Sequence, residues 1–138
     1  MHPIYLCSMG ANIAPESNFA AARELILKLG KAYYSRAIYT QPVDMRSEHD
    51  FLNALFLIVS PLDSVALKEH FNAIEISLGR DRDDPLSSKK DRPMDIDILG
   101  ELSSDLVWQE VPDYLQEVVP NLKPIADKLV QTQGALHD

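Results

Sequence analysis

The run from Phe51 to Ser60 places the strongest limit on what this chain can fold into. It is apolar at every position except Asn53 and the final serine. A strand that is apolar on both faces is typical of a central strand buried on two sides. Because a buried amide needs hydrogen-bond partners, Asn53 either bonds to neighbouring backbone or faces a ligand, and the sequence leaves both open.

The patterns on either side of this strand predict the rest of a small α+β domain. In chain order, we expect a strand at 4–9 ended by a turn at Gly10-Ala11-Asn12, a helix at 15–29, a strand at 32–39, the strand at 51–60, a helix at 64–78 and a strand at 94–98. The order βαββαβ predicts a ferredoxin-like antiparallel sheet of four strands with both helices packed on one face.

The residues after 100 carry weaker signals. A further short strand is predicted at 106–111, and two short helices at 114–119 and 125–130, interrupted by Pro120 and Pro124, with a frayed end from 131 to 138. This part is therefore expected to be a short irregular or helical C-terminal extension. At 138 residues the chain is long enough for one domain with a real core, so we expect a single domain over 1–138.

Composition excludes several classes of function. The net charge of −8 argues against a general nucleic-acid binder, which needs a basic face. The single cysteine, Cys7, cannot form an internal disulfide, and the four histidines lack zinc-ligand spacing. No apolar run approaches the roughly 20 residues of a membrane helix, and the N-terminus lacks the features of a signal peptide. We therefore expect a cytoplasmic protein without membrane or nucleic-acid partners.

The segment 79–99 is the candidate site for chemistry. In the strand at 94–98, the period of two puts Asp95 and Asp97 on one face, with Cα atoms roughly 6.5–7 Å apart, so the two carboxylates can share one Mg²⁺. Five cations stand immediately upstream: Arg80, Arg82, Lys89, Lys90 and Arg92. Carboxylates for Mg²⁺ beside cations for phosphate oxygens are typical of phosphoryl transfer. The alternative is an ordinary solvated strand face beside a soluble loop.

Several motifs together resemble the 6-hydroxymethyl-7,8-dihydropterin pyrophosphokinase family of folate biosynthesis. The match is distributed, in the expected order, over residues 4–100. The matching stretches are Met9-Gly10-Ala11-Asn12, Ser35 with Thr40-x-Pro42-Val43, Asp50-Phe51-Leu52-Asn53-Ala54, Ile74-Glu75 with Gly79-Arg80-x-Arg82, and Arg92-x-x-Asp95-Ile96-Asp97-Ile98-Leu99. The resemblance implies the same βαββαβ fold and transfer of pyrophosphate from ATP to a pterin alcohol.

The resemblance also implies a role for each matching residue. Asp95 and Asp97 would hold two Mg²⁺ ions, and Asp97 is also a candidate for proton removal. The catalytic cations would be Arg80, Arg82 and Arg92. The pterin slot would be formed by Thr40, Pro42, Val43, Phe51 and Asn53, with Phe51 stacking on the ring. On the nucleotide side we expect Glu75 and Tyr114, together with Lys89 and Lys90, which are not themselves part of the resemblance.

The chain departs from the family pattern where ATP should be held. Lys89 stands in place of a tryptophan, Asp113 in place of a histidine, and no arginine follows Arg92. Two alternatives remain open on these residues. One is an active enzyme in which Lys89, Lys90 or Lys123 replaces the missing cations and Trp108 or Tyr114 covers the site. The other is a catalytically weak or inactive paralogue that acts as a pterin-like ligand-binding or interaction module.

Overall fold

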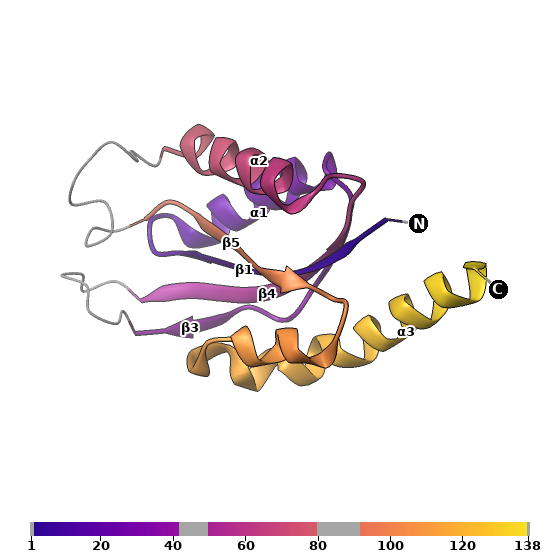
Figure 1. The fold of residues 1–138 in the computed structure, drawn as a ribbon. Helices are drawn as coiled ribbons and strands as arrows, with labels where there is room; N and C mark the ends of the chain where they lie inside the picture. The colour runs from indigo at the N-terminus through magenta and orange to yellow at the C-terminus, as the bar shows by residue number, and fades with distance from the viewer. Residues whose placement is uncertain (1, 42–49, 80–91, 138) are drawn as a thin grey trace.

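The structure is a computed structural model that describes residues 2–41, 50–79 and 92–137 (Figure 1). The elements, in chain order, are β1 (Ile4–Ala11), α1 (Pro15–Leu27), β2 (Lys31–Tyr34), β3 (Ile38–Thr40), β4 (Phe51–Val59), α2 (Ser64–Ser77), β5 (Asp95–Glu101), the 3₁₀ helices η1 (Asp105–Glu110) and η2 (Asp113–Val118), and α3 (Val119–His137).

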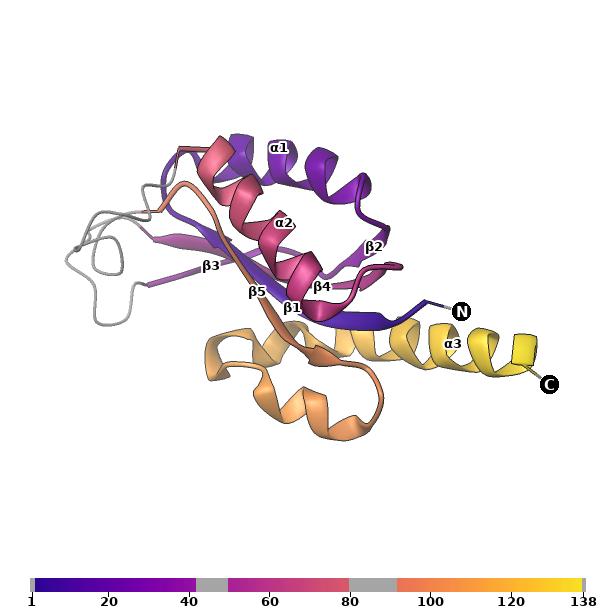
Figure 2. The same ribbon diagram turned by 45° about the horizontal axis from the view of Figure 1, so that its top comes forward.

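The described strands form one antiparallel sheet in the order β2-β4-β1-β5, with β3 also pairing with β4. Helices α1 and α2 cover one face, while η1, η2 and α3 lie on the other (Figures 1 and 2). This confirms the predicted α+β fold with a C-terminal extension. In the described ranges, no helix has both the length and the apolar character needed to cross a membrane.

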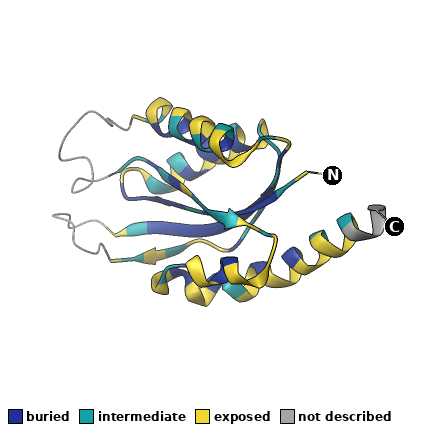
Figure 3. Cartoon of the chain, viewed as in Figure 1, coloured by how far each residue is buried: buried dark blue, intermediate teal, exposed yellow. Residues whose placement is uncertain are grey.

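The core consists of two apolar clusters, one on each face of the sheet, as the two-sided apolar pattern of β4 requires (Figure 3). Ala54, Phe56 and Ile58 face α1 and α2, whereas Leu55 and Leu57 face the C-terminal layer. Successive strand residues point to opposite faces, so each β4 residue can be assigned to one layer. By this alternation, Asn53 points toward the C-terminal side.

The first predicted strand boundary is wrong, because β1 continues through Gly10 to Ala11 instead of turning there. Gly10 pairs with Asn53 of β4 and with Asp95 of β5. A Cβ atom at Gly10 would lie 2.6 Å from the Asn53 Oδ1 atom. The glycine is therefore required by a close approach within the sheet, and the sequence pattern could not distinguish this from a turn.

The strand predicted at 32–39 is divided into β2 and β3 by one extra residue opposite β4. Tyr34 pairs with Phe56 and Ile38 pairs with Asn53, so three residues stand opposite two. The Ser35 side chain stabilises this bulge, because its Oγ accepts a hydrogen bond from the Leu55 N–H at 3.0 Å and donates to the Arg36 carbonyl at 2.9 Å. The bulge shifts the register before the chain reaches Thr40.

The C-terminal predictions need two further corrections. The segment 106–111 lies mostly in the 3₁₀ helix η1 instead of a strand, with Val107 and Trp108 turned into the core. Pro120 and Pro124 do not break the chain into short helices, because α3 runs from Val119 to His137 without interruption. Pro120 lies in the first turn, where no N–H is needed, and buried Leu122 and Ala126 hold the next turn against the sheet despite Pro124.

Candidate functional site

A row of residues across three strands brings the two halves of the predicted site onto one face. Gly10 stands opposite Asn53 on one side and opposite Asp95 on the other, and residues directly opposite each other share a face of the sheet. This face is the one away from α1 and α2, because their cluster contains the neighbouring Met9, Ala54 and Ile96. Since Gly10 has no side chain, the Asn53 amide can lie over it toward Asp95.

Arg92 is bonded to the first aspartate of β5. Its Nη1 atom donates to Asp95 Oδ2 at 2.8 Å, and the two side chains are only 20% and 25% exposed. The guanidinium is thus held beside the carboxylate, and its predicted phosphate contact stays a prediction. The charge-assisted hydrogen bond keeps both groups oriented before a ligand binds.

The backbone of Arg92 is clamped by the end of β1. Asn12 Oδ1 accepts from the Arg92 N–H at 2.6 Å, and the Arg92 carbonyl accepts from the N–H groups of Asn12 at 3.0 Å and Ile13 at 3.3 Å. Asn12 is 5% exposed. The sequence placed Asn12 in a motif but gave no sign of this contact, which joins residues 80 positions apart.

The backbone of β5 is held by α2 between the two aspartates. Glu75 is fully buried, and its Oε2 accepts from the Ile96 N–H at 2.8 Å. Lys68 Nζ donates to the Ile96 carbonyl at 2.7 Å and to Asp97 Oδ1 at 3.1 Å. The buried Glu75 side chain supports the strand, and its predicted nucleotide contact stays a prediction. Lys68 was missed, because nothing local in a helical sequence indicates contact with a strand 28 residues later.

Asn53 is bonded within the predicted pterin slot. Its Nδ2 donates to Thr40 Oγ1 at 2.6 Å and to the Phe51 carbonyl at 3.3 Å. The amide is 5% exposed, so these bonds fix its orientation and place its Oδ1 over Gly10. The structure therefore brings Thr40, Phe51 and Asn53 together at one end of the sheet, where β3 ends and β4 begins.

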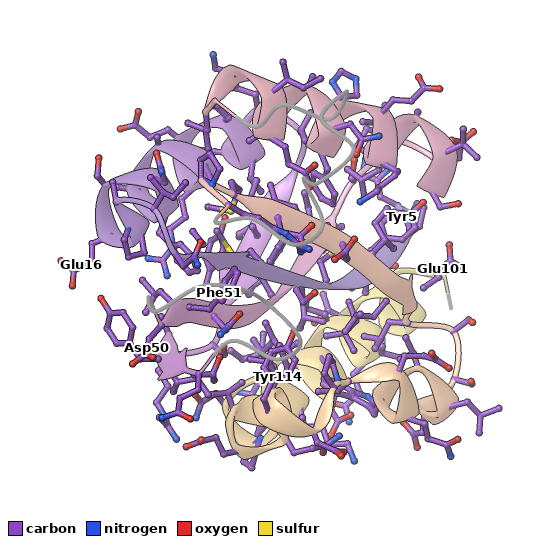
Figure 4. The ribbon with its side chains drawn as sticks, turned by 90° about the vertical axis from the view of Figure 1, so that its left-hand side faces the viewer. Tyr5, Glu16, Asp50, Phe51, Glu101 and Tyr114 are labelled. Atoms are coloured by element: carbon purple, nitrogen blue, oxygen red, sulfur yellow. The ribbon has the colours of Figure 1, made fainter. Side chains whose placement is uncertain are left out.

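Tyr114 stands on the C-terminal layer facing the aspartates. Burial raises the pKa of Tyr114, the charges of Asp95 and Asp97 raise it further, and Arg92 lowers it. Figure 4 looks onto this end of the sheet and shows Phe51 at the start of β4, with Tyr114 on the layer below. Like an ordinary tyrosine, Tyr114 keeps its hydroxyl proton at neutral pH, and its raised pKa only reinforces this, so it can donate a hydrogen bond.

Trp108 is placed elsewhere. It is buried in the C-terminal cluster, and Lys123 Nζ lies 5.8 Å from the centre of its ring. Together with Leu102 and Ala126, it also lines a cavity of about 430 Å³. This cavity lies beyond the C-terminal end of β5, whereas Asp95 is at the N-terminal end. Of the two aromatic residues considered for covering the site, Tyr114 lies near enough to the aspartates for their charges to raise its pKa, whereas Trp108 packs in the C-terminal cluster; the covering role stays a prediction.

Six of the predicted site residues lie outside the described residues: Pro42, Val43, Arg80, Arg82, Lys89 and Lys90. Their roles remain predictions from the sequence.

The aspartate pair fits a hard cation such as Mg²⁺. Both carboxylates lie on the same face of β5, and the Asp97 side chain is 52% exposed, so an ion has access to it. Carboxylate oxygens are the ligands that Mg²⁺ prefers, and it often takes only one or two from protein and the rest from water and phosphate. Among the described residues, no cluster of three or more histidine, cysteine or acidic side chains could hold an ion by itself.

Comparison with known proteins bears on the family of the chain. The family model of 7,8-dihydro-6-hydroxymethylpterin-pyrophosphokinase matches residues 6–126. The chain is also 34% identical, over 140 aligned positions, to the 2-amino-4-hydroxy-6-hydroxymethyldihydropteridine pyrophosphokinases of two Porphyromonas gingivalis strains, ATCC 33277 and W83. Each alignment covers 89% of this chain and 95% of the relative. With a family match over most of its length and relatives of nearly full coverage, this chain belongs to the 7,8-dihydro-6-hydroxymethylpterin-pyrophosphokinase family.

Proposed function

We propose that the chain transfers a pyrophosphoryl group from ATP to the hydroxymethyl group of 6-hydroxymethyl-7,8-dihydropterin in folate biosynthesis, and that it requires Mg²⁺. The observation that carries the proposal is the row Asn53, Gly10 and Asp95 across three adjacent strands. The row has the Asn53 amide and the Asp95 carboxylate on one face, separated by a single strand, which supports a pterin slot beside a metal pair. Two substrates that must react with each other need such neighbouring sites.

The pterin side of the proposal follows from the Asn53 hydrogen bonds. Because Nδ2 donates to Thr40 and to the Phe51 carbonyl, Asn53 presents Oδ1 as an acceptor. The amino group of a pterin is a donor of matching chemistry. Phe51 is partly exposed at the start of β4, where its ring can stack on the heterocycle. Pro42 and Val43 complete this slot in the proposal.

The phosphate side rests on Arg92, Asp95 and Asp97. Bound Mg²⁺ would be held by Asp95 and Asp97 and would neutralise phosphate charge. Arg92 offers its guanidinium to phosphate oxygens from beside Asp95. From the C-terminal layer, the Tyr114 hydroxyl would donate a hydrogen bond to the nucleotide. In the proposal Arg80, Arg82, Lys89 and Lys90 supply further positive charge, as their sequence positions indicate.

The reaction replaces one P–O bond with another. The pterin hydroxyl oxygen attacks the β-phosphorus of ATP, the bond from that phosphorus to the oxygen bridging to the α-phosphate breaks, and AMP leaves with the electron pair. The hydroxyl proton passes to a nearby base, for which Asp97 is the candidate. Positioning and charge neutralisation supply most of the rate in such transfers, which suits a site built of two carboxylates and nearby cations.

The test is the appearance of AMP. Purified protein with Mg²⁺, ATP and 6-hydroxymethyl-7,8-dihydropterin should form AMP and the pterin diphosphate in equal amounts, measured by ³¹P NMR. Asp97→Asn should form neither, whereas Asp127→Asn, at an exposed position on α3, should behave as wild type.

The same samples distinguish the second candidate. Binding of the pterin by calorimetry without AMP formation would contradict the enzyme and favour a ligand-binding module. The feature that keeps this candidate in view is Asp113 in η2, a carboxylate on the layer where the nucleotide would lie, which repels phosphate unless a cation lies between.

A further inference from the structure

We propose that Lys68 is a positioning residue that holds Asp97 in the free protein and lowers the affinity of the Asp95–Asp97 pair for a bare divalent cation. The inference rests on the metal pair of the proposed function and deepens it. In this proposal the affinity for a metal ion depends on a lysine of α2, which lies outside every sequence motif that suggested the site.

Lys68 is fixed by two contacts and is not a freely swinging surface lysine. Its Nζ lies 2.7 Å from the Ile96 carbonyl and 3.1 Å from Asp97 Oδ1, and its side chain is 35% exposed. Within the described residues β5 is an edge strand, so the Ile96 carbonyl and N–H face away from β1 and toward α2. Glu75, two helical turns after Lys68, binds the N–H, and Lys68 binds the carbonyl.

Two ion pairs among the described residues neutralise the aspartates before a metal arrives. Arg92 is bonded to Asp95 and Lys68 to Asp97, so these four side chains carry no net charge. A bare divalent cation at the aspartates therefore meets an ammonium on the same carboxylate and is repelled by it. A cation that arrives bound to a polyphosphate brings its own anionic ligands, so this repulsion opposes it less.

The direction in which metal affinity changes when Lys68 is removed distinguishes the proposed role from a purely structural one. A partly exposed ion pair contributes little to stability. If Lys68 served only to hold β5 in place, its removal would leave metal affinity unchanged or weaken it by disordering Asp97. If Lys68 opposes the ion, its removal strengthens metal binding even though the strand loses a contact.

The experiment measures Mn²⁺ binding to the free protein by electron paramagnetic resonance, without nucleotide. Lys68→Gln removes the charge and keeps a donor for the Ile96 carbonyl, and Lys68→Met removes both. We expect both variants to bind Mn²⁺ about three- to tenfold more tightly than wild type, in line with the loss of one nearby positive charge. Lys68→Arg, which keeps the charge, and Lys28→Met, at an exposed position after α1, should bind as wild type does.

Three results would overturn the inference. Equal or weaker Mn²⁺ binding by Lys68→Gln, with a wild-type circular dichroism spectrum, would contradict it alone and leave the metal pair intact. A gain that persists when Asp97→Asn is added would show that the ion binds elsewhere. No Mn²⁺ binding by wild type, Lys68→Gln or Lys68→Met would contradict the inference together with the metal pair of the proposed function.

Discussion

The strand of the two aspartates, β5, and the C-terminal layer are held in place in different ways. Around β5, side chains bind backbone groups of distant segments, as Asn12 binds Arg92 and both Glu75 and Lys68 bind Ile96. The layer formed by η1, η2 and α3 is instead held to the sheet mainly by a cluster of apolar side chains such as Leu115, Val118 and Leu122. Hydrogen bonds have preferred distances and angles, whereas the burial of apolar surface is not directional. We therefore expect the hydrogen bonds around β5 to fix the positions of its side chains, and the C-terminal layer to set the shape of the surface beside them.

The largest effect is expected at Asp97, because the carboxylate that we propose as a metal ligand would act through its charge. Asp97→Asn keeps the shape of the side chain but should lower the rate of AMP formation by about a thousandfold or more. Stability should change by less than about 1 kcal/mol, because the ion pair with Lys68 is half exposed. Steady-state AMP assays and thermal unfolding measure the two quantities. If the loss of activity were accompanied by a large loss of stability, Asp97 would instead have a structural role.

The next effect is expected at Gly10. In Gly10→Ala the new methyl group would meet Asn53 Oδ1 at 2.6 Å, so the amide must move. Pterin affinity should fall by at least about tenfold, with a loss of about 1–3 kcal/mol in unfolding free energy. Calorimetry and denaturant unfolding test this. In an Asn53→Ala background the same change should have a much smaller effect, and additive losses would contradict the contact.

A matched pair of asparagines compares the two regions directly. Asn12→Ala removes the side-chain bond to the Arg92 N–H and should lower stability by about 1–3 kcal/mol and kcat by about tenfold. Asn121→Ala removes a similar bond, from the Arg36 N–H to Asn121 Oδ1 at 3.1 Å, on the C-terminal layer. It should lower stability by about 1 kcal/mol or less with kcat unchanged. Equal losses of kcat in the two variants would remove the distinction drawn between the regions.

The smallest effect is expected at Pro124, within α3. Pro124→Ala restores an N–H that can bond to the Pro120 carbonyl, and alanine is the better helix former. Stability should rise by about 0.5–2 kcal/mol, with no change in AMP formation or pterin affinity. A change in AMP formation or in pterin affinity would show that α3 also influences the site.

The sequence predicted what depends on local pattern. The alternation around Ile96 placed Asp95 and Asp97 on one face, and the two-sided apolar run placed β4 in the middle of the sheet. It could not predict contacts that only the folded chain creates, such as the reach of Lys68 to β5. Local rules also failed for Gly10, since a glycine needed for close packing and a glycine in a turn have the same sequence.

The C-terminal errors have a common cause. Apolar residues such as Val107 and Trp108 suit a strand by propensity, but packing against the sheet draws them into the 3₁₀ helix η1. Pro124 indicates a helix end by local rules, yet buried neighbours on α3 outweigh one lost hydrogen bond. Where apolar packing dominates, tertiary contacts decide the structure, and single-residue signals are weakest there.

The central claim is that the pterin slot and the metal pair share one row of the sheet. Asn53 and Asp95 are separated by β1 alone, a distance of about 10 Å between strands. The direct measurement is paramagnetic broadening of the bound pterin by Mn²⁺ in the presence of a non-hydrolysable ATP analogue. The account predicts strong broadening of the hydroxymethyl protons, abolished by Asp97→Asn with pterin still bound. Sharp pterin resonances while both Mn²⁺ and pterin are bound would contradict it.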